Sequence, residues 1–313
     1  MKKSEAKTGI FSRGLTAKQP NAAPQPVNGI FVRMYSDVNC PQDDLIMQDF
    51  GNTFDAEQLC YMAVEKLELT PLVAPLFALA QPSLESWCPP NEKIDCSEDC
   101  AREFVLRVRF IPPLSVITKL SHTNSKMFNY LFQQIRSDFI NDRIGYQNKS
   151  IGQEYLLGLG VVDMVRYGKQ HGINLTELRS LGPQNFIPAG AKNKFRNLLD
   201  KQRLKMNFKP HLEDQYKQYE SDSVVNVQLT YVKGITEYAE HYGMETFRIE
   251  STYSRSEPTI VQVKPYDSEF PGLNIYKGKV VQTVLRFYLL QLLCIIVCSR
   301  INMDELVLSI VSD

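Results

Sequence analysis

The sequence predicts an α+β protein built from three successive lobes. Strand-type alternation of apolar and polar residues dominates residues 29–110, apolar residues recur at three- and four-residue steps between residues 121 and 241, and strand-type alternation returns after Met244. The chain has 313 residues, which is too long for one small core and suits lobes of roughly 100 residues each. The expected order is therefore a mixed lobe, a helical lobe and a β lobe.

The first lobe is expected to span residues 29–118 and to open with two strands, at residues 29–35 and 45–50. Thr53 is expected to cap the helix that follows. The apolar positions of this helix recur at helical steps: Leu59, Met62, Ala63 and Leu67.

Two further strands, at residues 76–79 and 104–110, complete this lobe. The last strand alternates strictly, with Leu106 on one face and Arg107 on the other. Trp87, the only tryptophan of the chain, lies between these strands beside two sheet-breaking prolines, and we expect it to be a structural anchor rather than a binding residue. The order strand, strand, helix, strand is typical of a ubiquitin-like β-grasp lobe.

The second lobe is expected at residues 119–243, as a compact bundle of four or five helices. Three long helical patterns fall at residues 127–139, 150–171 and 224–241. A short helix is expected to start at Asn174 or Thr176 and to end at Gly182.

A third, sheet-based lobe is expected at residues 244–313, and it is too short to be complete. Residues 280–298 are strongly apolar, but their unbroken core at 287–298 is short of the roughly 20 residues that a bilayer requires. Two interpretations of this segment stay open. It is either a strand or helix that covers the third lobe, or the product of a truncated or alternatively spliced transcript.

Composition excludes several classes of partner and site. Lysine plus arginine balance aspartate plus glutamate at 35 each, which gives no support for a nucleic-acid partner. Seven scattered cysteines are typical of reduced cytosolic thiols, and Cys96 and Cys100 lack the second pair that a zinc site needs. Residues 1–28 are expected to be a disordered leader. No metal or cofactor is expected.

No motif in the sequence predicts catalysis. Gly158 and Gly160 lie in an apolar helical stretch with no strand before them, so we expect them to allow close helix packing rather than to bind a nucleotide. The histidines are far apart and are expected at the surface or at helix ends: His122, His171, His211 and His241. We therefore predict no catalytic residue and no small-molecule substrate.

Basic residues crowd the stretch 192–209, which we call the basic segment, and only Asp200 opposes them there. They are Lys192, Lys194, Arg196, Lys201, Arg203, Lys205 and Lys209. The apolar residues between them would bury one face of a helix and leave the basic side chains on the other face. Such a stripe is either an ordinary solvated helix face or a docking surface for an acidic partner.

Short phrases spread over residues 29–278 carry a family resemblance. In the first lobe they are Leu76-Phe77-Ala78-Leu79, Trp87 with Pro89-Pro90-Asn91, and Arg107-Val108-Arg109-Phe110. In the second they are Tyr130-Leu131-Phe132-Gln133, Asp138-Phe139, Leu159-Gly160-Val161-Val162-Asp163-Met164, Phe186-Ile187-Pro188, Tyr231, and His241-Tyr242-Gly243. Their order and spacing resemble the FERM domains of the Janus kinases, a family of non-receptor tyrosine kinases. The third lobe, which the resemblance implies is pleckstrin-homology-like, departs from the family after Tyr276, and no kinase domain follows in this chain.

The resemblance implies a function for the basic segment. In the family, the helical FERM lobe holds the membrane-proximal segment of cytokine receptors, which favours docking over a plain solvated face. We therefore expect a non-catalytic, cytoplasmic docking module that is peripheral at the inner face of the plasma membrane or an endomembrane. Its expected partners are a cytokine receptor tail and acidic membrane lipid. The alternative is a general FERM adaptor for cytoskeleton or lipid that has no kinase parent.

Overall fold

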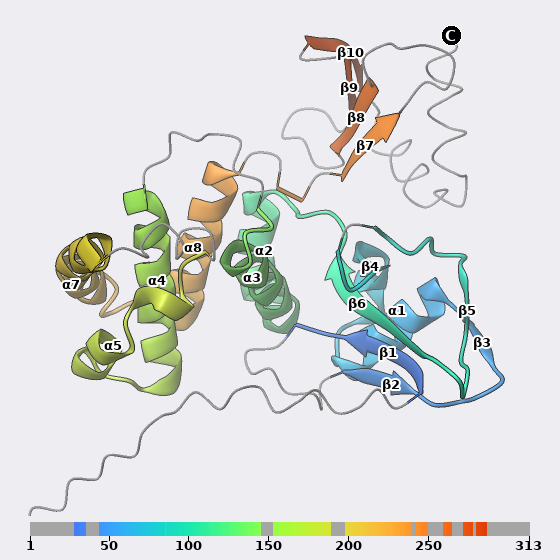
Figure 1. Cartoon of the computed structure of the whole chain (residues 1–313), viewed down its shortest axis with the longest axis horizontal. Coiled ribbons are helices and arrows are strands. Elements are labelled where there is room, and N and C mark those ends of the chain that lie inside the picture. The colour runs from blue at the N-terminus through green and yellow to red at the C-terminus, as the bar shows by residue number, and fades with distance from the viewer. Residues whose placement is uncertain are drawn as a thin grey trace, which may run out of the picture.

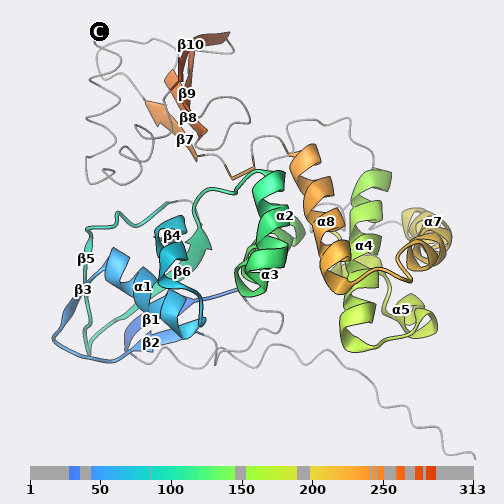
Figure 2. The same cartoon turned by 180° about the vertical axis from the view of Figure 1, so that it is seen from behind.

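The computed structural model describes residues 28–35, 44–84, 86–144, 153–188, 198–239, 242–243, 245–249, 259–264, 272–277 and 280–286. Within these ranges a mixed sheet-and-helix lobe is followed by a helical lobe and then by a separate β sheet (Figures 1 and 2). This order confirms the predicted α+β class. The expected leader at residues 1–28 lies outside the described residues, apart from Asn28.

The first lobe is a four-stranded sheet with one helix packed on it. Its order is β2-β1-β6-β4, and the central pair β1 and β6 is parallel while the outer pairs are antiparallel. The elements are β1 (Gly29–Arg33), β2 (Leu45–Met47), β3 (Thr53–Asp55), α1 (Ala56–Lys66), η2 (Pro71–Leu76), β4 (Phe77–Ala80), β5 (Lys93–Asp95) and β6 (Ala101–Val108). Strands β3 and β5 form a separate antiparallel pair.

The start of α1 differs from the prediction. Thr53 belongs to β3, where its side chain donates to Asp95, and Asp55 is the residue that precedes the helix. The backbone N–H of Asp55 donates to the side chain of Gln58 at 2.9 Å, as in a capping box. Because both Thr and Asp favour the capping position, the pairing of β3 with β5 decides between them.

Trp87 anchors the first lobe less deeply than expected. It is half-buried and forms a single antiparallel bridge with Ala80, while its neighbour Cys88 is buried and donates its backbone N–H to Leu79. The core under the sheet comes instead from the strands, where Leu79 pairs with Leu106 and both are buried.

The second lobe is a helical bundle. Its elements are α2 (Leu114–Thr123), α3 (Ser125–Ile140), α4 (Gln153–His171), α5 (Leu175–Leu181), η3 (Pro183–Asn185), α7 (Leu198–Gln218) and α8 (Val224–Tyr238). The three long predicted helices are confirmed. Of the two starts that the sequence allowed for the short helix, the structure has Asn174, whose side chain accepts the backbone N–H of Glu177. Helix α2 begins at Leu114, directly after Pro113 and before the boundary expected at residue 119.

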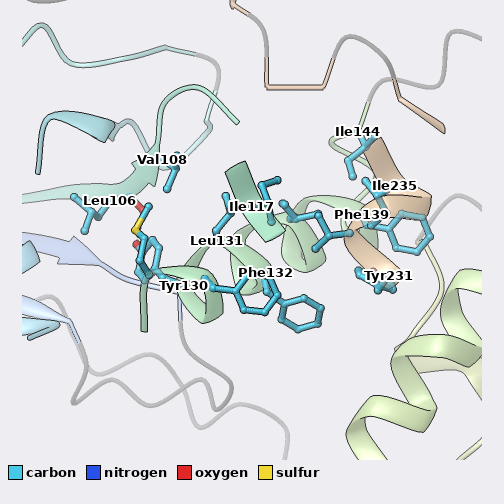
Figure 3. Close-up of a cluster of buried hydrophobic side chains, with 14 of the residues drawn as sticks. Leu106, Val108, Ile117, Tyr130, Leu131, Phe132, Phe139, Ile144, Tyr231 and Ile235 are labelled. Atoms are coloured by element: carbon cyan, nitrogen blue, oxygen red, sulfur yellow. The ribbon is translucent and has the colours of Figure 1, made fainter. Parts of the chain in front are cut away.

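One part of the core of the bundle, beside the buried residues of α4, lies between α3 and α8. Phe132 and Phe139 of α3 both meet the ring of Tyr231 edge-on, with ring centroids 5.6 and 5.8 Å apart. Figure 3 shows these rings together with Ile117 of α2 and Ile235 of α8 in one buried cluster. Aromatic pairs in this geometry add to the stability that burial of their area provides.

Close helix packing accounts for Gly160, as predicted. A Cβ at this position would lie 2.7 Å from Cγ2 of Ile187 and 3.0 Å from the backbone oxygen of Phe186. Gly158 is different, because a Cβ there would meet no atom within 4 Å. Only one glycine of this pair is therefore required by packing.

The third region is an antiparallel sheet in the order β10-β9-β8-β7. Its strands are β7 (Glu245–Ile249), β8 (Thr259–Lys264), β9 (Gly272–Lys277) and β10 (Val280–Arg286). The apolar segment predicted at residues 280–298 thus starts as a strand that pairs with β9, with a register shift after Val281. The rest of that segment, residues 287–298, lies outside the described residues.

Candidate functional site

The basic segment is described only in part. Lys192, Lys194 and Arg196 lie outside the described residues, whereas Lys201, Arg203, Lys205 and Lys209 belong to α7. Lys209 is exposed, and the adjacent Phe208 is buried. This end of the segment therefore has the amphipathic arrangement that the sequence predicts.

Helix α7 is held firmly along its second half. Leu212 is buried, as is Tyr219 directly after the helix, and Glu213 forms an ion pair with Arg179 of α5. Beyond the helix end, Nζ of Lys169 on α4 donates to the backbone oxygens of Glu220 and Asp222, both at 2.9 Å. These contacts fix the helix that carries the basic residues onto α4 and α5.

The interface between the first two lobes contains a buried ion pair. The guanidinium of Arg107 on β6 donates to both carboxylate oxygens of Asp138 on α3, at 3.0 and 2.5 Å. Arg107 also donates to the hydroxyl of Tyr35, and the hydroxyl of Tyr242 donates to Asp138 at 2.7 Å. The side chain of Asp138 has no solvent exposure. A bidentate pair whose carboxylate accepts a further hydrogen bond, here from Tyr242, is the arrangement that offsets the cost of burying charge.

The surroundings of Asp138 raise the pKa values of Arg107, Tyr35 and Tyr242. Burial alone would lower the pKa of Arg107, but the hydrogen bonds and charge of Asp138 raise it above its usual value. Burial raises the pKa of Tyr35 to about 12, against the lowering effect of Arg107. Burial also raises the pKa of Tyr242, and Asp138 adds to that rise. The arginine stays charged and both phenols stay protonated, so that Tyr242 donates to Asp138 while the Tyr35 hydroxyl accepts from Arg107.

Two more side chains of α3 bind the backbone of β6. Gln134 accepts the backbone N–H of Val108 at 2.7 Å and donates to the backbone oxygen of the same residue at 3.0 Å. The hydroxyl of Tyr130 donates to the oxygen of Leu106 at 2.7 Å. All these groups are buried, so the two lobes are joined by specific polar contacts as well as by apolar packing.

A second buried carboxylate organises the interior of the helical lobe. Asp163 on α4 has no exposed side chain and pairs with Arg136 at 2.6 Å and with Arg166 at 2.7 Å. The guanidinium of Arg166 lies 5.0 Å from the centre of the Phe132 ring. The sequence analysis predicted no buried ion pair at Asp138 or Asp163. Each aspartate stands next to buried apolar residues of its helix, and this position is the signal that could have revealed it.

The other residues weighed from sequence do not converge on a chemical site in the described parts of the chain. His122, His171 and His211 are exposed, and His241 lies outside the described residues. Cys96 is buried and donates to the oxygen of Met47, whereas Cys100 is exposed. No group of three or more histidine, cysteine, aspartate or glutamate side chains gathers there in a way that could hold a metal ion. Among the described helices, none combines the length and apolar character needed to cross a membrane.

The lobes match known domains. Residues 30–113 match the FERM F1 ubiquitin-like domain, and residues 121–238 match the FERM F2 acyl-CoA binding protein-like domain. The chain therefore contains the F1 and F2 lobes of a FERM domain. The ubiquitin-like first lobe and the helical second lobe predicted from sequence are confirmed.

Two solved structures of a myosin MyTH4-FERM domain, wild type and mutant, share this fold. The MyTH4-FERM MF2 domain of Dictyostelium discoideum myosin VII matches with a TM-score of 0.57 at 12% identity, over 85% of this chain and 50% of that one. A mutant of the same domain gives a TM-score of 0.54 at 10% identity, over 85% and 52%. The human myosin 7b C-terminal MyTH4-FERM domain, in complex with the harmonin-a PDZ3 domain, gives 0.39 at 12% identity, over 78% and 48%. The chain thus spans about half the length of these myosin chains.

Proposed function

We propose that this chain is a non-catalytic docking module whose F2 lobe binds the membrane-proximal cytoplasmic segment of cytokine-type receptors. In this proposal it derives from a Janus-type tyrosine kinase and acts in the cytoplasm at the inner face of a membrane. The proposal rests on the F1 and F2 lobes of a FERM domain and on the phrases that the sequence shares with Janus kinases.

The basic segment is the observation that carries the proposal. Seven basic residues lie within residues 192–209, whereas the second half of α7 also carries Glu213 and Asp214. Positive side chains near the start of a helix gain nothing from the helix dipole, so helix stability does not explain them. An acidic or lipid-associated partner does explain them.

The expected strength follows from simple electrostatics. Each basic residue near an anionic membrane surface contributes about 1 kcal/mol, and the attraction fades over a Debye length of about 8 Å at physiological salt. Loss of three such residues should therefore weaken binding by about 3 kcal/mol, or more than a hundredfold. Raising the salt concentration should also weaken binding, because salt screens the attraction.

The test is binding of receptor juxtamembrane peptides, presented on vesicles with and without acidic lipid. The variant replaces Lys194, Arg196 and Arg203 by glutamate. We expect it to lose peptide binding while its circular dichroism spectrum stays unchanged. Unaltered binding by this folded variant, or no binding by the wild-type protein to any receptor peptide, contradicts the proposal.

The control has the same change in net charge at other places. Lys119 of α2, Lys217 at the far end of α7 and Lys233 of α8 are all exposed, and all three are replaced by glutamate. We expect this variant to bind as the wild type does. If both variants lose binding equally, only the overall charge matters and the basic segment is not the docking site.

The second candidate is a FERM adaptor that binds acidic lipid or cytoskeletal proteins and has no kinase parent. The same basic segment supports it, because lipid phosphates need no receptor sequence. Vesicle binding that is equally strong without receptor peptide favours this candidate. Kinase motifs encoded downstream of residue 313 would favour the first.

A further inference from the structure

The two connections between lobes meet at one place. Residues 109–113 lead from β6 to α2, and residues 239–244 lead from α8 to β7. Both views show α2 beginning and α8 ending on the side of the molecule where the third sheet lies (Figures 1 and 2). The contacts of Gly243 and Tyr242 show how closely the second connection is held there.

Gly243 is pressed against the first connection. Its φ is +79°, which side chains with a Cβ rarely adopt, and a Cβ here would lie 2.3 Å from Cγ1 of Ile111 and 3.0 Å from its backbone nitrogen. The backbone of Gly243 therefore lies against the side chain and the backbone nitrogen of Ile111. Only glycine allows this approach.

Tyr242 joins the same place to the interface between F1 and F2. Its backbone N–H donates to the oxygen of Ala239 at 2.9 Å, and its hydroxyl donates to Oδ2 of Asp138 at 2.7 Å. Oδ2 is also the atom that accepts from Nη2 of Arg107. One buried oxygen thus bonds a strand of F1 and the connection that leads toward the third sheet.

We propose that Asp138 is a positioning residue that locks the connection to the third sheet onto the F1–F2 interface. Arg107 holds the carboxylate in a fixed orientation, and the carboxylate in turn holds Tyr242. Arg143, 3.9 Å from the other carboxylate oxygen, and Tyr35, bonded to Arg107, are the other titratable groups that face this junction. A partner that separates F1 from F2 must also release Tyr242, so the third sheet changes position together with the interface.

The test is hydrogen exchange of the folded protein, followed by mass spectrometry on peptides that cover residues 236–249. Tyr242→Phe removes one hydroxyl bond to a buried carboxylate and keeps the ring. Because bonds to charged groups are stronger than neutral ones, we expect exchange in this peptide to accelerate roughly tenfold or more. Tyr155→Phe is the control, since it removes a hydroxyl bond to the oxygen of Gly234 at 2.8 Å on α8, two residues before this peptide, and leaves Asp138 untouched.

A second pair of variants separates packing from backbone strain. Gly243→Ala and Gly172→Ala both place a Cβ at a positive φ, of 79° and 64°, but only Gly243 meets atoms of another segment within 4 Å. We expect faster exchange at residues 236–249 for Gly243→Ala alone. The proposal is overturned if Tyr242→Phe exchanges like the wild type there, or if the two alanine variants accelerate that peptide equally.

Discussion

Two glycines that lie two residues apart on α4, Gly158 and Gly160, should respond differently to the same substitution. Alanine at Gly160 would place its Cβ 2.7 Å from Cγ2 of Ile187 and 3.0 Å from the backbone oxygen of Phe186. Alanine at Gly158 would meet no atom within 4 Å. Cγ2 of Ile187 is bonded directly to Cβ of a buried, β-branched side chain, so this methyl group and the backbone of Phe186 can both move only if the turn after η3 shifts with them.

The magnitudes follow from two terms. Replacing glycine by alanine inside a helix stabilises by about 1 kcal/mol, and this gain applies to both positions. Overpacking a filled interior costs about 1–3 kcal/mol, and this cost applies only to Gly160. Gly158→Ala should therefore raise the free energy of unfolding by about 1 kcal/mol, while Gly160→Ala should leave it unchanged or lower it by up to about 2 kcal/mol.

The assay is urea unfolding followed by circular dichroism at the helix band, on both variants and the wild type. Because the propensity gain cancels between the variants, their difference isolates the packing cost of about 1–3 kcal/mol. Equal midpoints for the two variants, at equal slopes, would refute the reasoning. Such a result would mean that α4 does not pack against Phe186 as closely as the structure has it.

Two further predictions concern buried groups. Asp163→Asn leaves Arg136 and Arg166 without their shared anion and should lower the free energy of unfolding by about 3–5 kcal/mol in a urea titration. The control Glu103→Gln removes an exposed ion pair with Arg33 and should lower it by less than about 1 kcal/mol. Similar losses for the two variants would contradict the prediction that the buried pairs are the stronger ones. Burial raises the pKa of Cys60 from its usual 9.0 to about 12, so the unfolded chain ionises first and the free energy of unfolding should fall as pH rises from 9 toward 12. The Cys60→Ala variant should show a shallower fall, and parallel curves would exclude this thiol as a cause.

Local pattern was sufficient to predict most elements of the first two lobes. The three long helices, the short helix that Asn174 caps, and the strands around Leu79 and Leu106 all lie where periodicity and capping chemistry predict them. These features depend on residues that are near in sequence, so a single sequence contains the signal. The start of α1 was wrong because Thr53 and Asp55 are both good caps, and the choice depends on strand pairing with residues 93–95.

The buried charges could not be predicted in the same way. Arg107 stands on the face of β6 opposite Leu106, and alternation predicts that this face is polar and half-exposed. Asp138 instead covers it from another lobe, so that Arg107 is only 8% exposed. The identity of a buried ion pair depends on which helix packs on which strand, and residues 107 and 138 are too far apart in the chain for spacing to connect them.

By itself, then, the sequence determined the α+β fold class, the order of the lobes and the location of a strongly basic segment, because composition and periodicity are properties of short stretches. Only the tertiary structure decided how the lobes are joined. It places Arg107, Asp138 and Tyr242 on one another and presses Gly243 against Ile111. Contacts of this kind arise from packing between segments that are distant in the chain. Burying a charged side chain or a backbone polar group is unfavourable unless the fold places a hydrogen-bonding or oppositely charged partner beside it.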